Sequence, residues 1–128
     1  MKLEMIDSKQ AKLLEDVSWR NITVKKGFKF DGASIPKLFW NVIGSPFTGK
    51  YRVAALIHDG LYAAEAYERD ICDIIFLEIM KEHGVSWLKR HTMYMAVRAG
   101  GWAVWKTHTT QSVEKAKLYV RTEYEIFN

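Results

Sequence analysis

The chain has 128 residues, of which 48% are hydrophobic and 13% aromatic, and this composition suits one compact domain with a single core. The formal net charge is +4, but the Lys and Arg residues are spread along the chain, which excludes the concentrated basic patch of a specific nucleic-acid binder. The single cysteine, Cys72, excludes an internal disulfide. No run of the sequence approaches the roughly 20 apolar residues of a membrane span, and the amino-terminal residues lack the apolar stretch of a signal peptide.

The first third of the chain, residues 1–36, is expected to be rich in β-structure. Alternating apolar side chains and a Lys-Lys-Gly turn predict short strands at residues 3–6, 22–24 and 28–30. A loop follows at residues 31–36, and Pro36 can open a short helix over residues 37–42, because its missing N–H is not needed in the first helical turn.

Helical signals begin at residue 50 and continue to residue 105. Apolar periodicity predicts three helices, at residues 50–66, 67–83 and 86–105, with Gly84 ending the second and Ser86 capping the third. Gly100 and Gly101 could kink or end the third helix, and residues 112–124 are compatible with either helix or strand. We therefore expect an α+β fold that is mostly α. A small N-terminal β-hairpin or sheet (1–36) precedes a helical core (50–105), and residues 1–128 form a single domain.

The pair His58-Asp59 stands out within the first long helix. From residue 53 to residue 64 only these two side chains and Tyr62 can ionise, and a helix that is apolar nearly all round is normally buried. Burying an imidazole beside a carboxylate is costly unless both find partners or a metal ion. This cost makes the pair the first functional candidate.

Asp73 is the second candidate. On a helical projection it is flanked by Phe76, Leu77 and Met80 on the side that should face the core. A hairpin of two long antiparallel helices would bring it toward His58, where it would fix the imidazole tautomer and stabilise the imidazolium, leaving the Asp59 carboxylate to bind a cation.

The His-Asp-x-Leu-Tyr motif at 58–62 resembles the His-Asp-x-Cys-Tyr helix of secreted phospholipases A2. The bacterial and fungal branch of that superfamily has an Asp-Gly-Cys-Ser loop, then Cys-x-x-His-Asp, then Asp-x-x-Phe-x-x-x-Met. This chain has the corresponding blocks Asp31-Gly32-Ala33-Ser34, Ala55-Leu56-Ile57-His58-Asp59 and Asp73-Ile74-Ile75-Phe76 with Met80. Alanine replaces both cysteines, as a cytoplasmic relative would show.

This resemblance implies a role for each matching residue. Asp31 and Asp59, with the Gly32 carbonyl, would bind calcium, which prefers oxygen ligands. His58 would be the general base for an attacking water, Asp73 its orienting partner, and the Tyr62 hydroxyl a hydrogen bond to Asp73. The 27 residues between Asp31 and Asp59 exceed the spacing in the microbial enzymes, so the loop must fold differently.

The chain is also similar to an uncharacterised phage and prophage family, a domain of unknown function. Its members share a Gly-Phe-x-x-Asp-Gly-Ala-Ser-Ile-Pro block, here at 27–36, followed by the His-Asp-x-Leu-Tyr block and a later Asp-x-x-Phe, a likeness that runs from about residue 22 to about 101. The similarity implies a phage origin and a place in the host cytoplasm or in the virion.

A purely structural interpretation accompanies each candidate. The pair His58-Asp59 could be satisfied by neighbouring groups, Asp73 could be paired with Arg69 one turn earlier, and Asp31-Gly32 is common in turns. The aromatic residues Trp40, Trp87, Trp102 and Trp105, with Phe39 and Phe47, could form a lipid-binding surface, but such residues are more often core. Residues 35–47 are the best candidate for exposed apolar contact.

Other hydrolase classes fit the sequence less well. A His-Asp phosphohydrolase needs a further histidine upstream, and none precedes His58. Ser34 lies in no nucleophile-elbow motif, Cys72 has no evident activating base, and the other histidines have no metal-site spacing. The expected function is thus calcium-assisted hydrolysis of a phospholipid or other ester, at a membrane surface or in solution. The alternative is a non-enzymatic virion component or an inhibitor of a host protein that keeps the site for structure.

Overall fold

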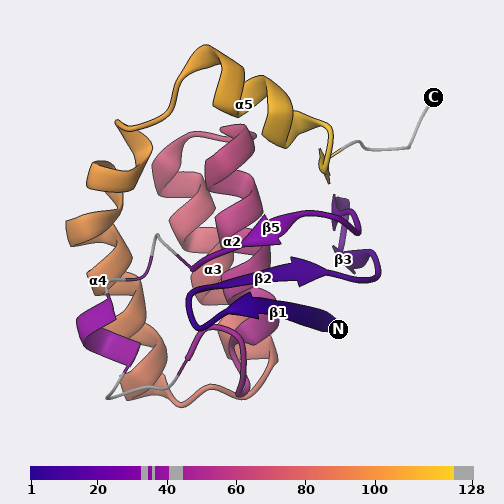
Figure 1. Cartoon of the computed structure of the whole chain (residues 1–128). Helices are drawn as coiled ribbons and strands as arrows, with labels where there is room; N and C mark the ends of the chain where they lie inside the picture. The colour runs from indigo at the N-terminus through magenta and orange to yellow at the C-terminus, as the bar shows by residue number, and fades with distance from the viewer. Residues whose placement is uncertain (33–34, 36, 41–44, 123–128) are drawn as a thin grey trace.

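The computed structural model describes residues 1–32, 35, 37–40 and 45–122. Within them the chain forms short strands and four α-helices (Figure 1). The strands are β1 (Leu3–Asp7), β2 (Gln10–Leu13), β3 (Val17–Trp19), β4 (Ile22–Val24), β5 (Lys29–Phe30) and β6 (Val120–Arg121). The helices are the 3₁₀ turn η1 (Lys37–Phe39), α2 (Arg52–Ala64), α3 (Arg69–Glu82), α4 (Trp87–Trp105) and α5 (Thr110–Lys117).

The strands form two separate antiparallel sheets of three strands each. The first has the order β1-β2-β5 and the second the order β3-β4-β6. Half of the described chain (50%) is helical and 17% is strand. The prediction of a mostly α chain with one small N-terminal hairpin or sheet is therefore wrong, because β2 and β3 were missed and the C-terminal β6 completes the second sheet by pairing with β4. The fold is α+β.

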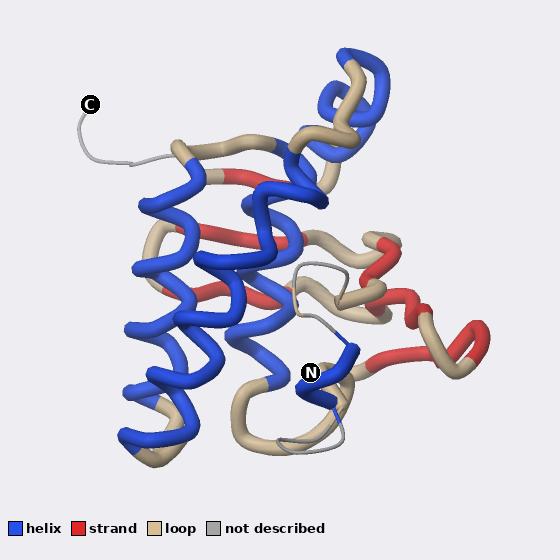
Figure 2. The backbone as a smooth tube through the Cα atoms, turned by 90° about the vertical axis from the view of Figure 1, so that its left-hand side faces the viewer, coloured by secondary structure: helices blue, strands red, loops and turns tan. Residues whose placement is uncertain are grey.

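Helix α2 occupies the centre of the molecule. It contacts α3 and α5 as well as strands of both sheets, and the strands run across the direction of the long helices (Figure 2). All but three of its 13 residues are buried, as its apolar sequence requires. Gly60 lets α2 approach β4 closely, since a Cβ at this position would lie 3.0 Å from a methyl carbon of Val24. Helix α2 therefore carries His58 and Asp59 into the core.

Helix α3 packs on α2, and α4 packs on the other side of α3. The loop between α2 and α3 begins at Glu65, whose left-handed conformation (φ 46°) ends α2. Ser86 caps α4 as predicted, because its hydroxyl accepts the Lys89 N–H at 3.3 Å. Helix α4 runs unbroken through Gly100 and Gly101, so these glycines neither kink nor end it.

The chain between residues 106 and 122 contains both kinds of structure that its sequence allowed. Helix α5 is followed directly by strand β6, and residues 123–124 of the predicted segment lie outside the described residues. In the predicted short helix at 37–42, residues 37–39 form the 3₁₀ turn η1, and residues 41–42 lie outside the described part of the chain.

The aromatic residues expected in the core are divided between core and surface. Phe47 is buried, and Trp40 and Trp105 lie at the edge of the core. Trp87 is 63% exposed and Trp102 is 51% exposed, so the expectation of a core position is wrong for these two. No helix of the described residues has the length and apolar character needed to cross a bilayer.

Candidate functional site

The structure brings His58 of α2 and Asp73 of α3 into direct contact. The Nε2 atom of His58 lies 2.7 Å from Asp73 Oδ1, and both side chains are fully buried. The imidazole ring lies between two aromatic rings, with centroid distances of 4.3 Å to Tyr62 and 4.7 Å to Phe76. The helical hairpin thus fixes both the position and the plane of the imidazole.

Tyr62 reaches the same carboxylate oxygen from the next turn of α2. Its hydroxyl donates to Asp73 Oδ1 at 2.7 Å. Residues four apart on a helix lie on one face, so the His58–Tyr62 spacing presents both side chains to α3. The three residues assigned to water activation by sequence form one hydrogen-bonded group, while their catalytic roles remain predictions.

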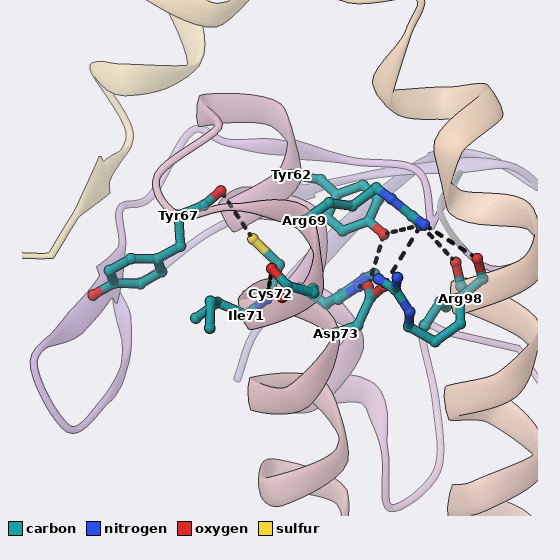
Figure 3. Close-up of polar contacts among 10 residues, drawn as sticks. Tyr62, Tyr67, Arg69, Ile71, Cys72, Asp73 and Arg98 are labelled. Carbon is teal, nitrogen blue, oxygen red and sulfur yellow. Dashed lines mark hydrogen bonds and ion pairs between the residues drawn. The ribbon is translucent and has the colours of Figure 1, made fainter.

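Two arginines complete the shell around Asp73, and the sequence did not assign either of them to the site. Arg98 of α4 donates to Asp73 Oδ2 at 2.8 Å, and Arg69 lies 3.6 Å from the same oxygen (Figure 3). Arg69 also donates to the Tyr62 hydroxyl at 3.2 Å and to the Val97 carbonyl at 3.1 Å. The carboxylate therefore receives His58 and Tyr62 on one oxygen and the guanidinium groups on the other.

The environment sets the protonation of the dyad. Burial lowers the pKa of His58, and the hydrogen bond to Asp73 only partly offsets this effect. Burial alone would raise the pKa of Asp73, but hydrogen bonds from His58, Tyr62 and Arg98 outweigh it and hold that pKa below its usual value. An ionised Asp73 can only accept, so Nε2 of the neutral imidazole carries its proton and Nδ1 carries the lone pair.

Asp59 faces away from the dyad, toward the loop after β5. Its Oδ2 atom accepts the Asp31 N–H at 3.4 Å, and it has hydrogen-bonding interactions with the Gly32 backbone and the Asp31 side chain as well. Burial raises the pKa of Asp59 well above its usual value, and the charge of Asp31 raises it further. The three predicted calcium ligands are thus neighbours in the structure.

The donor chemistry of these three residues fits a hard cation in part. The buried Asp59 carboxylate lies beside the exposed Asp31, and a positive charge there would relieve their repulsion. The Gly32 carbonyl, however, accepts the Ile35 N–H at 3.0 Å, so one of its lone pairs is already used. No cluster of three or more acidic, His or Cys ligands occurs among the residues that the structure describes, so water oxygens would have to complete the coordination of an ion.

The remaining candidates have structural partners or no activating group. Cys72 is buried, and burial raises the pKa of its thiol to about 12, which opposes a role as nucleophile. His108 Nδ1 pairs with Glu65 at 2.7 Å, and His91 Nδ1 lies 2.9 Å from the Trp87 carbonyl. Ser34 lies outside the described residues.

Comparison with known proteins identifies similar sequences without a described activity. A family model described as "Protein of unknown function (DUF1353)" matches residues 9–97. A relative from Sinorhizobium fredii (strain NBRC 101917 / NGR234), "Uncharacterized protein y4jT", is 42% identical over 80 residues, which is 61% of this chain and 23% of the relative. The chain thus matches less than a quarter of that protein's length. No solved structure matches the chain.

The matched region contains both sheets except β1 and β6, all of α2 and α3, and all six residues that the sequence assigned to the site. Because the model covers more than half of the sequence, the chain belongs to the DUF1353 family.

Proposed function

We propose that this protein is a hydrolase in which His58, held by Asp73, activates a water molecule for attack on an ester. The observation that carries the proposal is the 2.7 Å contact between His58 Nε2 and Asp73 Oδ1, with Tyr62 donating to the same oxygen. Burial keeps this imidazole neutral, and the neutral imidazole is the form that a general base requires.

The residues of the dyad would act in sequence as the water attacks. Nδ1 of His58 takes a proton from the water, and the resulting imidazolium is stabilised by the ionised Asp73 through Nε2–H. The same proton would then pass from Nδ1 to the leaving alcohol. Arg98, Arg69 and Tyr62 keep the Asp73 carboxylate ionised and in place, so they are positioning groups.

Calcium is part of the proposal, with Asp31, Asp59 and the Gly32 carbonyl as its ligands. The ion would polarise the ester carbonyl and stabilise the oxyanion. The proximity of the two carboxylates and the raised pKa of Asp59 support a positive charge at this place. Phospholipid as the substrate, and a phage origin with a place in the host cytoplasm or the virion, rest on the resemblances described above.

A second, non-enzymatic function is favoured by a specific observation. His58 is 0% exposed, and among the described residues no buried side-chain nitrogen or oxygen lacks a hydrogen-bond partner. A fully satisfied buried network fixes a unique core without any catalytic role. In that case the chain would serve as a virion component or as an inhibitor of a host protein, and catalysis would not occur because water cannot reach Nδ1.

The deciding experiment measures fatty-acid release from phospholipid vesicles and the hydrolysis of a panel of soluble esters, in calcium and in a chelator. We expect calcium-dependent hydrolysis that falls at least a hundredfold in Asp73→Asn and in His58→Ala. His83→Asn, at an exposed histidine, is the matched control and should retain full activity.

Each variant is also tested by thermal unfolding, because loss of fold would imitate loss of catalysis. If the Asp73→Asn variant is folded but no longer hydrolyses the substrate, the result supports the proposed enzymatic function. A chain that hydrolyses none of the esters, and in which His58→Ala and Asp73→Asn change stability alone, assigns the network to structure and refutes the proposal.

A further inference from the structure

A large apolar surface lies on η1 and the amino-terminal half of α4. Leu38 is 77% exposed, Trp87 63%, Leu88 69% and Met95 63%. Figure 1 shows η1 against the half of α4 nearer its amino terminus. Between them runs an open groove of about 610 Å³, with Phe39 on one wall and Leu88, His91 and Met95 among the residues of the other. We call this surface, formed by Leu38, Phe39, Trp87, Leu88, His91 and Met95, the η1–α4 face.

The exposure follows from the composition of α4. Only Met93, Ala96, Val97 and Gly101 of its 19 residues are buried. The helix therefore uses one narrow stripe for packing, although large apolar side chains continue around its circumference. Scattered exposed apolar residues are ordinary, but a contiguous set with a groove is typical of a binding surface.

The charged residues in the two segments that form this face are all basic. From residue 84 to residue 113 the sequence contains no Asp or Glu, and none occurs between Asp31 and Asp59. Lys37 and Lys89 are exposed within these two segments, and the Lys37 ammonium lies 5.9 Å from the Trp40 ring. The η1–α4 face is therefore apolar with a basic border, and its natural complement is apolar and negatively charged.

We propose that the η1–α4 face docks the protein onto an anionic lipid surface. Trp and Leu side chains would enter the headgroup region while Lys37 and Lys89 pair with lipid phosphates. A second copy of the chain is a poorer occupant, because a two-fold contact would place these lysines near their own copies with no acid on the face to separate them.

This docking does not depend on ester hydrolysis, and the test keeps the two apart. The intact chain is mixed with vesicles of ether-linked phospholipid, which contain no carboxylic ester, and the bound fraction is measured by sedimentation. One set of vesicles contains phosphatidylglycerol with phosphatidylcholine headgroups, and the other contains phosphatidylcholine alone. We expect binding to the anionic set that weakens as salt is added.

Matched variants locate the binding surface. Met95→Ser should weaken partitioning about tenfold, whereas Met5→Ser, at a half-exposed methionine on β1, should leave it unchanged. Lys89→Glu should weaken it at least fivefold, and Lys12→Glu on β2, also exposed, should change it little. Within each pair of variants, the same substitution is made on two different faces of the molecule. A difference in binding within a pair therefore cannot come from a general loss of positive charge or hydrophobicity.

Three results would overturn the proposal. The first is equal binding to both sets of vesicles, or none to either. The second is an equal loss in the Met95 and Met5 variants. The third is a dimer in sedimentation equilibrium that Met95→Ser dissociates without any effect on lipid binding, which would assign the face to a second copy of the chain. Hydrolytic inactivity alone would leave the docking result standing.

Discussion

Gly101 is a position where the backbone of α4 lies against Tyr62 of the candidate site. A Cβ built here would overlap the Tyr62 hydroxyl, lie 2.9 Å from Arg69 Nη1 and lie 3.1 Å from Tyr62 Cε2. Gly101→Ala should therefore push the Tyr62 hydroxyl away from Asp73, or push α4 away from α2. Either movement disturbs the hydrogen bonds that hold the carboxylate.

The expected sign is opposite to that of helix propensity. In the interior of a helix, Gly→Ala stabilises by about 1 kcal/mol. Overpacking in a filled core costs about 1–3 kcal/mol, and losing a hydrogen bond to a charged group costs about 1.5–3 kcal/mol. We expect Gly101→Ala to lose about 2 kcal/mol net, which lowers the Tm of a chain of this length by roughly 7 °C.

The assay is thermal unfolding followed by circular dichroism. Ala103→Gly, at an exposed position of the same helix, is the control for propensity and should lose about 1 kcal/mol. Tyr62→Phe removes the overlapping oxygen, so the double variant should be more stable than the sum of the single effects predicts. If Gly101→Ala is as stable as the parent while Ala103→Gly is destabilised, the close packing of α4 on Tyr62 is refuted.

Three further predictions concern single residues. In a chelator at neutral pH, Asp59→Asn should raise Tm, because burial and the charge of Asp31 raise the Asp59 pKa, so that any stability from this group is present in acid and lost as the pH rises. Calcium should stabilise the parent protein but not the variant. Equal stabilisation of both proteins would contradict an ion at this place. For Asp73 the sign is reversed, because its pKa lies below the ordinary value of 3.8, so its contribution to stability is present at neutral pH and is lost as the pH falls below that value. Asp73→Asn should therefore flatten the acid side of the curve of stability against pH, measured by urea unfolding. An unchanged curve would show that the neighbouring groups do not stabilise the carboxylate. Ser86→Ala should cost about 1 kcal/mol in the same assay because the cap of α4 is lost, and a neutral result would mean that water replaces the hydroxyl.

The contacts among His58, Tyr62 and Asp73 followed from local rules. Helical spacing places His58 and Tyr62 on one face, and a short loop between two apolar helices brings Asp73 opposite to them. Arg98 could not be found in this way, because it comes from a helix 25 residues further along the chain and its register depends on how α4 packs. The Arg69 pairing considered for Asp73 is present together with the His58 contact, at 3.6 Å and 2.7 Å, so the two interpretations were not alternatives.

The β-structure was also hard to predict, because it depends on pairing between segments that lie far apart in the sequence. The missed strands β2 and β3 have only four and three residues, and so short a run gives a weak alternating pattern. Strand β6 exists because Val120 pairs with Val24 across most of the chain, and no local signal specifies that pairing. Likewise, nothing in the sequence of α4 distinguishes the buried Met93 from the exposed Met95 until the neighbouring helix is known.

The pairing of β4 with β6 has a consequence for how the chain folds during synthesis. Val24 pairs with Val120, and the Asn21 side chain donates to the Thr122 carbonyl at 3.1 Å. Both contacts can form only after the C-terminal residues have been synthesised. The first sheet and the α2–α3 hairpin can form from earlier segments, but the second sheet closes only after α5 has been made. Contacts between distant segments are entropically slow to form, so β4 would leave the ribosome with one edge still open. During that interval the exposed edge of β4 can pair with a strand of another nascent chain.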